Sequence, residues 1–181
     1  METNDEQNSV PESTGPLKIA LSILAVLVVI SIGYVFWYRA HLADNVLDAM
    51  RSGQYSRAVG FLETAVEEDS VDAMILLGNM NYLGLGTDTD AQTAADLYQR
   101  AGLRGSIDAQ YNLALLYHSG IGVKQDNVSA AAWFLLADAG GNHRADQFLR
   151  TLTGQMNPNM IQQAYELQRE LGEKIQAAQE Q

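Results

Sequence analysis

The stretch SVDAMILLGNMNYLGLGTDTDAQTAADLYQRAGLRG (residues 70–105) is followed at once by SIDAQYNLALLYHSGIGVKQDNVSAAAWFLLADAGG (residues 106–141). The second stretch repeats the first at an offset of 36 positions, and most matching residues are small or turn-forming: Ala73 with Ala109, Gly84 with Gly120, Gly86 with Gly122, Asp90 with Asp126, Ala94 with Ala130, Ala101 with Ala137, and Gly105 with Gly141. A fixed period in this range is typical of stacked helical hairpins, none of which can bury its apolar face alone. The repeat therefore predicts an all-α fold, a short α-solenoid of helical hairpins, and favours binding over catalysis.

The same pattern extends to both sides of the two copies. Three second (B) helices share one template of small residues around a large apolar pair: Ala58, Phe61, Leu62 and Ala65, then Ala94, Leu97, Tyr98 and Ala101, then Ala130, Trp133, Phe134 and Ala137. The first (A) helices are predicted over residues 71–83, 107–119 and 144–153. Pro158 opens a last helix with a polar outer face, as expected of a cap that closes a solenoid.

The second copy resembles a Sel-one-like repeat (SLR), a branch of the tetratricopeptide superfamily with a period of 36 residues. The residues that carry the resemblance are DAQYNLALLYHSGIGVKQD (residues 108–126) and AAAWF (residues 130–134). The first copy departs from the pattern at Asn81 and at residues 87–89, and the third A helix lacks the Gly-x-Gly. The resemblance implies tetratricopeptide-like hairpins from about Tyr55 to Ile175 and an adaptor or scaffold role in multiprotein complexes.

The run IALSILAVLVVISIGYVFWY (residues 19–38) contains no charged residue. As a helix it would span roughly 30 Å, the thickness of a bilayer core, and aromatic residues gather at its C-terminal end, where they favour the membrane interface. A buried core helix is rarely apolar on every face over this length. A cleaved signal peptide is disfavoured by the acidic start, the long apolar run and the bulky residues where a cleavage site would lie. We therefore expect a single uncleaved transmembrane helix over residues 18–38.

The remaining boundaries follow from composition. Residues 1–17 are polar and acidic and predict a disordered tail. The helical repeats are predicted over residues 39–157 and the C-terminal capping helix over residues 158–181.

The chain is acidic and carries no motif of a catalytic or metal site. It has 22 Asp and Glu against 11 Lys and Arg and no Cys, which argues against nucleic-acid binding and excludes disulfides and thiolate chemistry. A calcium loop starting at Asp88 would need Gly near position 93 and Glu at 99, where Thr93 and Gln99 stand. The three His residues have no metal spacing. We expect no enzyme activity, no cofactor and no metal.

A binding groove is implied by the resemblance, because tetratricopeptide-like arrays line their concave face with A helices. The residues placed there are Asp72, Asn79, Tyr82, Asp108, Tyr111, His118, Arg144 and Gln147. Asn79, Asn112 and Arg144 resemble part of the carboxylate clamp that some relatives use on peptide C-termini, but Ile75 and Phe148 hold the other two clamp places. An ordinary solvated polar face is the alternative for any one of these residues.

These observations predict a membrane-anchored protein–protein interaction scaffold, an accessory subunit of a membrane or cell-envelope complex. A receptor that recruits a soluble peptide or client, or a regulator of a cell-envelope enzyme, are the alternatives. We expect the bacterial inner (cytoplasmic) membrane as the location. Lys18 on one flank against Arg39, Arg51 and Arg57 on the other favours cytoplasmic repeats, whereas bacterial members of the repeat family are frequently exported. Of the two sides we expect the periplasmic one.

Overall fold

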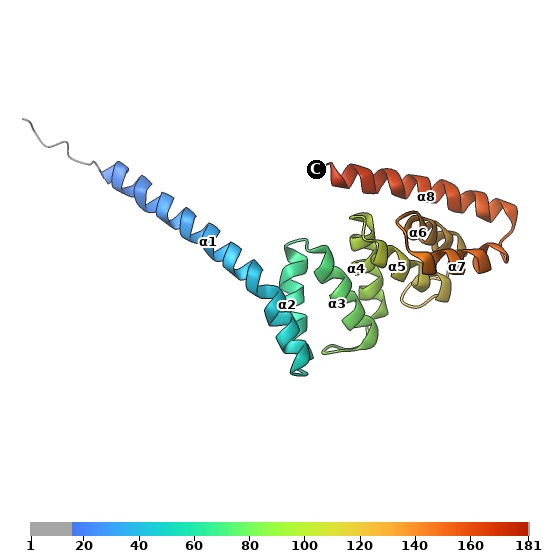
Figure 1. The fold of residues 1–181 in the computed structure, drawn as a ribbon, viewed down its shortest axis with the longest axis horizontal. Coiled ribbons are helices and arrows are strands. Elements are labelled where there is room, and N and C mark those ends of the chain that lie inside the picture. Colours follow the sequence, from blue (N-terminus) through green and yellow to red (C-terminus); the bar gives the residue numbers. More distant parts are fainter. Residues whose placement is uncertain (1–15, 181) are drawn as a thin grey trace, which may run out of the picture. The chain divides into compact units, whose positions relative to one another are not determined.

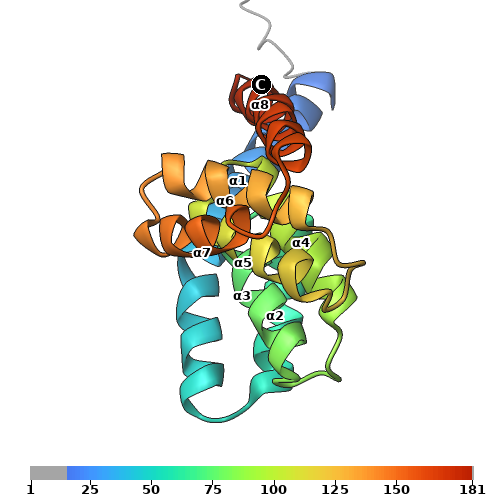
Figure 2. The ribbon, with the colours of Figure 1, turned by 90° about the vertical axis from the view of Figure 1, so that its right-hand side faces the viewer.

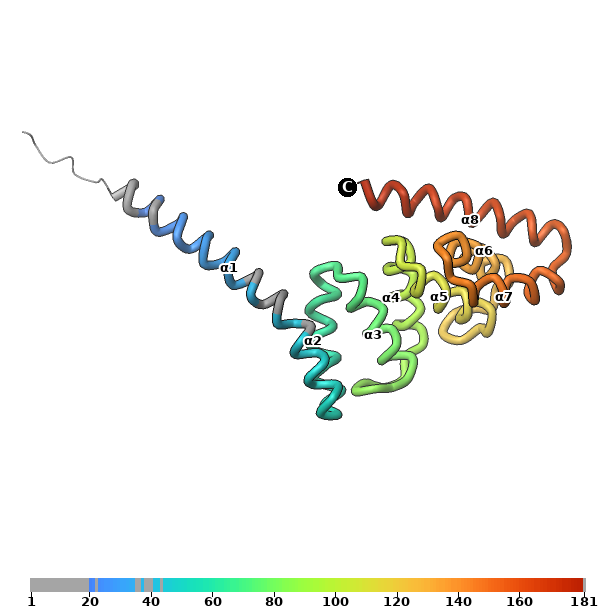
Figure 3. The backbone as a smooth tube through the Cα atoms, in the orientation of Figure 1, coloured from blue at the N-terminus to red at the C-terminus, as the bar shows by residue number. Residues whose placement is uncertain are grey.

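The computed structural model describes residues 16–180 (Figure 1). Within that range it does not describe the side chains of residues 16–19, 22, 35, 36, 38–40 and 43, and Figure 3 draws in grey the residues whose placement is uncertain. The predicted disordered tail over residues 1–17 lies outside the described residues, except at its last two positions. The chain divides into two compact units, residues 1–43 and 44–181, and each is described by itself.

The described residues form eight helices. In chain order they are α1 (Pro16–Arg51), α2 (Tyr55–Glu67), α3 (Val71–Leu83), α4 (Ala91–Leu103), α5 (Ile107–Ser119), α6 (Asn127–Ala139), α7 (His143–Thr153) and α8 (Pro158–Gln179). The A helices α3 and α5 begin and end at the residues that the repeat predicts, and α7 begins one residue earlier than expected. The prediction of an all-α array of hairpins is confirmed.

The first unit contains most of α1, and its described apolar side chains are exposed. They are Leu21, Ile23, Leu24, Val26, Leu27, Val28, Val29, Ile30, Ile32, Tyr34 and Trp37. Within the part of the chain that the structure describes, no helix combines the length and apolar character needed to cross a membrane. The structure thus shows a helix over residues 18–38 but does not show the transmembrane helix expected there.

In the second unit the hairpins stack in chain order. Helix α3 packs against α4 and α5 against α6, while α2–α3, α4–α5 and α6–α7 join one hairpin to the next. The last helix, α8, packs against the B helices α6 and α4. The stack can be followed in Figure 1 and, from the end that carries α7 and α8, in Figure 2.

Small residues hold the helices close together, as the B-helix template predicts. Ala94 and Ala130 are fully buried, and so are Ala101 and Ala137, about two turns further along the same helical face. Among the described side chains that are fully buried, Phe134 is one of the largest, and burying an aromatic side chain of this kind stabilises the fold by about 1.5–3 kcal/mol. The core is therefore made of alanine contacts with large apolar side chains between them.

Acidic residues cap the two B helices α4 and α6. Asp90 Oδ1 accepts a hydrogen bond from the Thr93 backbone N–H at 3.0 Å, and Asp126 Oδ1 accepts one from Val128 at 2.9 Å. These bonds satisfy N–H groups that have no partner inside the helix. Hydrogen bonds from the Thr93 backbone and hydroxyl also hold the pKa of Asp90 below its ordinary value.

The Gly-x-Gly loops explain why each hairpin fits its predecessor. Gly86 and Gly122 both have positive φ, and a Cβ atom at Gly86 would overlap the backbone of Tyr55 and Ser56 at the start of α2. At Gly122 a Cβ atom would overlap the backbone at Ala91, at the start of α4. Glycine is required at these places by both the backbone conformation and the closeness of the preceding repeat.

Candidate functional site

The A-helix side of the array carries exposed apolar side chains. On α3 these are Leu76, Tyr82 and Leu83, of which Leu83 is 61% exposed, and on α7 the exposed aromatic side chain is Phe148. The capping helix α8, in contrast, packs against the B helices. Exposed apolar groups on a face that the cap leaves uncovered are a feature of interaction surfaces.

The predicted groove residues differ in exposure. Asp72, Tyr82, Asp108, Arg144 and Gln147 are exposed, Asn79 and His118 are half-buried, and Tyr111 is buried. Only 4% of Tyr111 is accessible, so its ring lies beneath the surface on which the sequence placed it.

The first junction, defined as α3, α4 and α5, contains two hydrogen bonds made by buried side chains of α4 and α5. The Tyr98 hydroxyl donates to Asn79 Oδ1 at 2.7 Å, and Gln110 Nε2 donates to the Gly102 carbonyl oxygen at 3.1 Å. Burial, with a smaller contribution from Tyr82, raises the pKa of Tyr98 to about 12. Asn79 is thus engaged within the hairpin through its amide oxygen, whereas a peptide carboxylate would need its Nδ2–H donors.

The second junction, defined as α5, α6 and α7, contains an aromatic cluster. Phe134 and Phe148 stack with their ring centroids 5.5 Å apart, and Tyr111 meets both rings edge-on, at 5.8 Å from Phe134 and 6.1 Å from Phe148. The Arg144 guanidinium lies over the Tyr111 ring, 4.9 Å from its centroid. Stacked and edge-to-face pairs in this range are favourable beyond the area that they bury.

Three buried side-chain polar atoms on α5 and α6 have no hydrogen-bond partner among the described residues. They are the Tyr111 hydroxyl oxygen and His118 Nδ1 on α5, and Asn127 Oδ1 in the first turn of α6. A buried polar group without a partner costs about 1–3 kcal/mol, and such groups are rare enough to need an explanation. The first junction pairs its Tyr98 hydroxyl, whereas the second leaves its Tyr111 hydroxyl unpaired.

An open pocket of about 360 Å³ lies at the second junction. Its lining residues are His118, Phe134, Gln147, Phe148, Thr151 and Leu152. The structure thus brings four of the predicted groove residues together: His118 and Gln147 line the pocket, Tyr111 supports its aromatic wall, and Arg144 covers Tyr111. Asp72, Asn79, Tyr82 and Asp108 do not contribute to it.

Four lining residues are not among the predicted groove residues, although one of them, Phe148, stands at a clamp place. They are Phe134, Phe148, Thr151 and Leu152. The 36-residue offset carries the signal that could have found two of them. Phe134 stands where the preceding repeat has Tyr98, and Phe148 stands where it has Asn112. Each change replaces a polar side chain by an apolar one at the same junction position.

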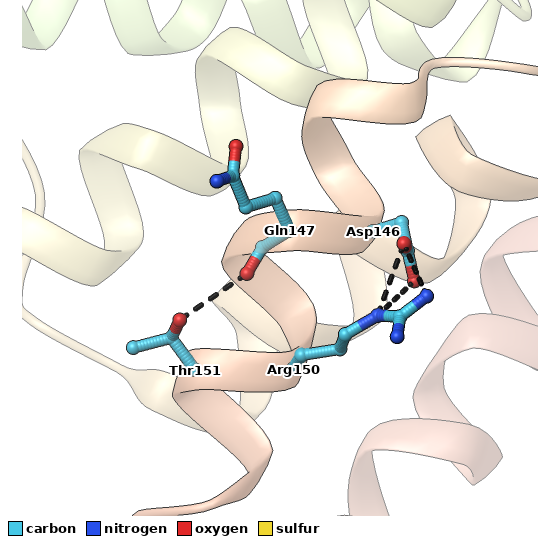
Figure 4. Close-up of polar contacts among 4 residues, drawn as sticks. All are labelled: Asp146, Gln147, Arg150 and Thr151. Carbon is cyan, nitrogen blue, oxygen red and sulfur yellow. Dashed lines mark hydrogen bonds and ion pairs between the residues drawn. The ribbon is translucent and has the colours of Figure 1, made fainter.

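Helix α7 separates two environments (Figure 4). On one side Arg150 forms an ion pair with Asp146, with Nη2 and Oδ2 2.7 Å apart. The Gln147 side chain points away from that pair, and the Thr151 hydroxyl donates to the Gln147 backbone carbonyl oxygen at 3.2 Å. The ion pair holds the pKa of Asp146 below its ordinary value. The Gln147 side-chain amide therefore lies on the pocket side of α7 and takes no part in the ion pair.

The chemistry of this arrangement is that of recognition. Apolar walls with a few converging polar groups are typical of binding pockets. Over the described part of the chain, no group of three or more His, Cys, Asp or Glu residues could hold a metal ion.

Comparison with known proteins agrees with the repeat architecture. The Sel1 repeat family model matches residues 71–106 and 107–142. Protein sel-1 homolog 2 of Rattus norvegicus is 34% identical over 73 residues, which is 40% of this chain and 11% of the relative. The human protein of the same name is 31% identical over 83 residues, 45% of this chain and 12% of the relative. The chain spans about a tenth of the length of these curated relatives.

Two solved structures resemble the array. A protective antigen present in uropathogenic Escherichia coli strains, which displays an SLR fold, aligns with a TM-score of 0.69 and 25% identity over 78% of this chain and 32% of the antigen chain. A Sel1 repeat protein from Oxalobacter formigenes aligns with a TM-score of 0.56 and 26% identity over 70% of this chain and 54% of its own. The array is an all-α, SLR-like solenoid of stacked hairpins. The two repeats over residues 71–142 match the Sel1 repeat, a scaffold consistent with a role in protein interactions.

Proposed function

We propose that this chain is a membrane-anchored scaffold that binds another protein on the A-helix face of its repeats. The observation that carries the proposal is the contrast between the two faces of the array. The cap helix packs on the B helices, whereas the A-helix side exposes Leu76, Leu83 and Phe148 and holds the pocket at the second junction. A partner segment on that face would remove apolar surface from water, which favours association.

Residues 19–38 support the anchor. They contain no charge, and the described apolar side chains of this part of α1 are exposed, Val29 at 69% and Leu21 at 57%. Exposed apolar side chains along a helix of this kind are stable in a lipid or protein environment and costly in water. We place the anchor in the inner membrane of a bacterium and the repeats on its periplasmic side, as an accessory subunit of a membrane or envelope complex.

The binding role is tested by recovering partners with the full chain, extracted from membranes in mild detergent. Adding a carboxylate to the A-helix face, as in Leu76→Glu with Leu83→Glu, is expected to reduce the co-purified partner at least roughly tenfold, because a charge would then be buried in the contact. The matched control adds two carboxylates on α8 at the exposed Gln163 and Gln176, as Gln163→Glu with Gln176→Glu. Equal recovery with the A-helix variant and the control would contradict the proposal.

The anchor and its orientation need a separate experiment. The full chain is expected to stay with the membrane fraction after alkaline carbonate washing, and protease added to intact spheroplasts is expected to digest the repeats. Release by carbonate would exclude a spanning anchor. Protection of the repeats until the spheroplasts are lysed would place them in the cytoplasm.

A further inference from the structure

We propose that the pocket at the second junction takes an aromatic side chain from an extended partner peptide with an acidic residue beside that side chain. The proposal names the partner chemistry of the A-helix face and so rests on the proposed function. It is carried by the differences between the two junctions, by the aromatic wall, by the unpaired polar atoms and by one uncompensated charge.

The pocket lies where the third A helix departs from the repeat template. Gln147 holds the place that Tyr111 holds one repeat earlier, and it is exposed whereas Tyr111 is buried. Phe148 replaces Asn112, and Leu115 replaces Asn79. Compared with the first junction, the second therefore has the Gln147 amide in place of the Tyr111 ring, and apolar side chains in place of the Asn112 and Asn79 amides. An aromatic ring from a partner would meet apolar walls there.

The geometry of the wall favours an aromatic occupant. Phe148 remains 38% exposed although its ring stacks on Phe134 with the two planes only 12° apart. An incoming ring can continue this stack or meet the Phe148 edge, as aromatic pairs prefer. An aliphatic side chain would gain burial alone.

Polar atoms around the pocket favour a tyrosine or a peptide backbone beside the ring. His118 lines the pocket, and its buried Nδ1 has no hydrogen-bond partner in the described range. The Gln147 side-chain amide likewise makes no hydrogen bond to a described residue, and it lines the same pocket. The exposed Gln147 amide can therefore hydrogen-bond a hydroxyl or a peptide group of the ligand.

The charge next to the pocket favours an acidic neighbour in the peptide. Arg144 and Phe148 are four residues apart on α7 and so share one helical face. Within the described residues no carboxylate forms an ion pair with Arg144, whereas Arg150 on the other side of the helix is paired with Asp146. Arg144 is thus the guanidinium that a partner carboxylate can engage, and such charge-assisted bonds are the stronger kind.

The test measures peptide binding to the full chain reconstituted in lipid nanodiscs. The probe is a fluorescein-labelled Gly-Ser-Glu-Tyr-Glu-Ser-Gly peptide, read by fluorescence anisotropy. Two control peptides replace Tyr by Ala or both Glu by Lys. We expect each control to bind at least roughly tenfold more weakly, because it lacks the ring or reverses the charge. Equal binding of the Ala peptide or of the Lys peptide would overturn the proposal.

Two substitutions on α7 form a matched pair, since each removes one positive charge. Arg144→Gln is expected to weaken binding of the acidic peptide roughly tenfold. Arg150→Gln is expected to change it less than about twofold, because an exposed ion pair on the far side contributes little. An equal loss of peptide affinity in both variants would mean that only the overall charge of the protein matters. That result would contradict the assigned site.

A third variant fills the pocket with the residue that the preceding repeat has at that place. Gln147→Tyr is expected to lower peptide affinity at least roughly tenfold while the melting temperature stays the same or rises. Unchanged affinity in this folded variant would contradict the pocket.

The outcomes separate this inference from the proposed function. If Leu76→Glu with Leu83→Glu abolishes partner recovery but Gln147→Tyr does not, the A-helix face binds the partner and the pocket assignment is wrong. If neither variant changes partner recovery, the proposed function itself fails.

Discussion

At the first junction, the Tyr98 hydroxyl is buried between α3 and α4 and donates to Asn79. One repeat later, the equivalent positions hold Phe134 and Leu115, which cannot form that bond. The second junction instead buries the Tyr111 hydroxyl without a partner in the described residues and opens a pocket beside it. Of two junctions built on one template, the first thus pairs its buried tyrosine hydroxyl and the second leaves its buried tyrosine hydroxyl unpaired.

The difference between the two junctions indicates where an array of this kind can acquire a binding site. The features that stack the repeats are present in both copies: the capping residues Asp90 and Asp126 and the Gly-x-Gly loops that end at Gly86 and Gly122. The side chains between the A helices differ instead. A junction that pairs its buried polar groups contributes stability, whereas the junction that leaves them unpaired bears their cost and holds the pocket.

The largest expected effect tests what the two junctions share. Gly86→Ala and Gly122→Ala should each lower the free energy of unfolding by about 2–4 kcal/mol, because both combine positive φ with overlap of the preceding repeat. Denaturant unfolding measures the loss. Gly141→Ala is the matched control, with positive φ but no atom near its Cβ position, and should cost only about 1–2 kcal/mol.

Equal losses at Gly86, Gly122 and Gly141 would show that backbone conformation alone matters there. The loops would then not set the distance between repeats.

The next effect breaks the polar pair of the first junction. Tyr98→Phe should cost about 1–2 kcal/mol, because it leaves the half-buried Asn79 amide oxygen without its donor. Adding Asn79→Leu converts the pair to the Phe and Leu of the second junction. The double variant should lose less than the sum of the single losses, with a coupling of about 0.5–1.5 kcal/mol. Strict additivity in denaturant unfolding would mean that the bond contributes nothing.

A smaller effect, specific to Tyr98, is expected at alkaline pH. The folded protein holds the pKa of Tyr98 at about 12, above the ordinary value of 10.0. The native state therefore keeps this proton more tightly than the unfolded state does. The resulting stability is fully present below about pH 10 and is lost as pH rises toward about 12.

The stability difference between wild type and Tyr98→Phe should accordingly narrow between pH about 8 and pH about 11. An unchanged difference across this range would contradict the raised pKa.

The sequence predicted the parts of the fold that depend on local residues. Helices α3 and α5 begin just after Ser70 and Ser106, which cap them, and end at Gly84 and Gly120 in the left-handed conformation. Serine caps and glycine ends are local signals that a single sequence carries. The repeat predicted the boundaries of both helices to the residue, and these local signals are the physical reason for them.

The candidate site was less predictable because it depends on contacts between helices. Helical position placed Tyr111 on an A helix near the groove, but its burial results from packing against Phe134 and Phe148 on two other helices. Asn79 was assigned to the groove and is engaged by Tyr98 from the neighbouring helix. Which side chain covers another is decided by tertiary packing, and a repeat period does not contain that information.

The most direct measurement compares the free energies of unfolding of Tyr98→Phe and Tyr111→Phe, each of which removes one buried tyrosine hydroxyl. Tyr98→Phe should destabilise the protein by about 1–2 kcal/mol, because it breaks a hydrogen bond. Tyr111→Phe should leave stability unchanged or raise it by up to about 1 kcal/mol, because it removes a buried hydroxyl that has no described partner. A loss at Tyr111→Phe equal to that at Tyr98→Phe would contradict the distinction between a paired first junction and an unpaired second one.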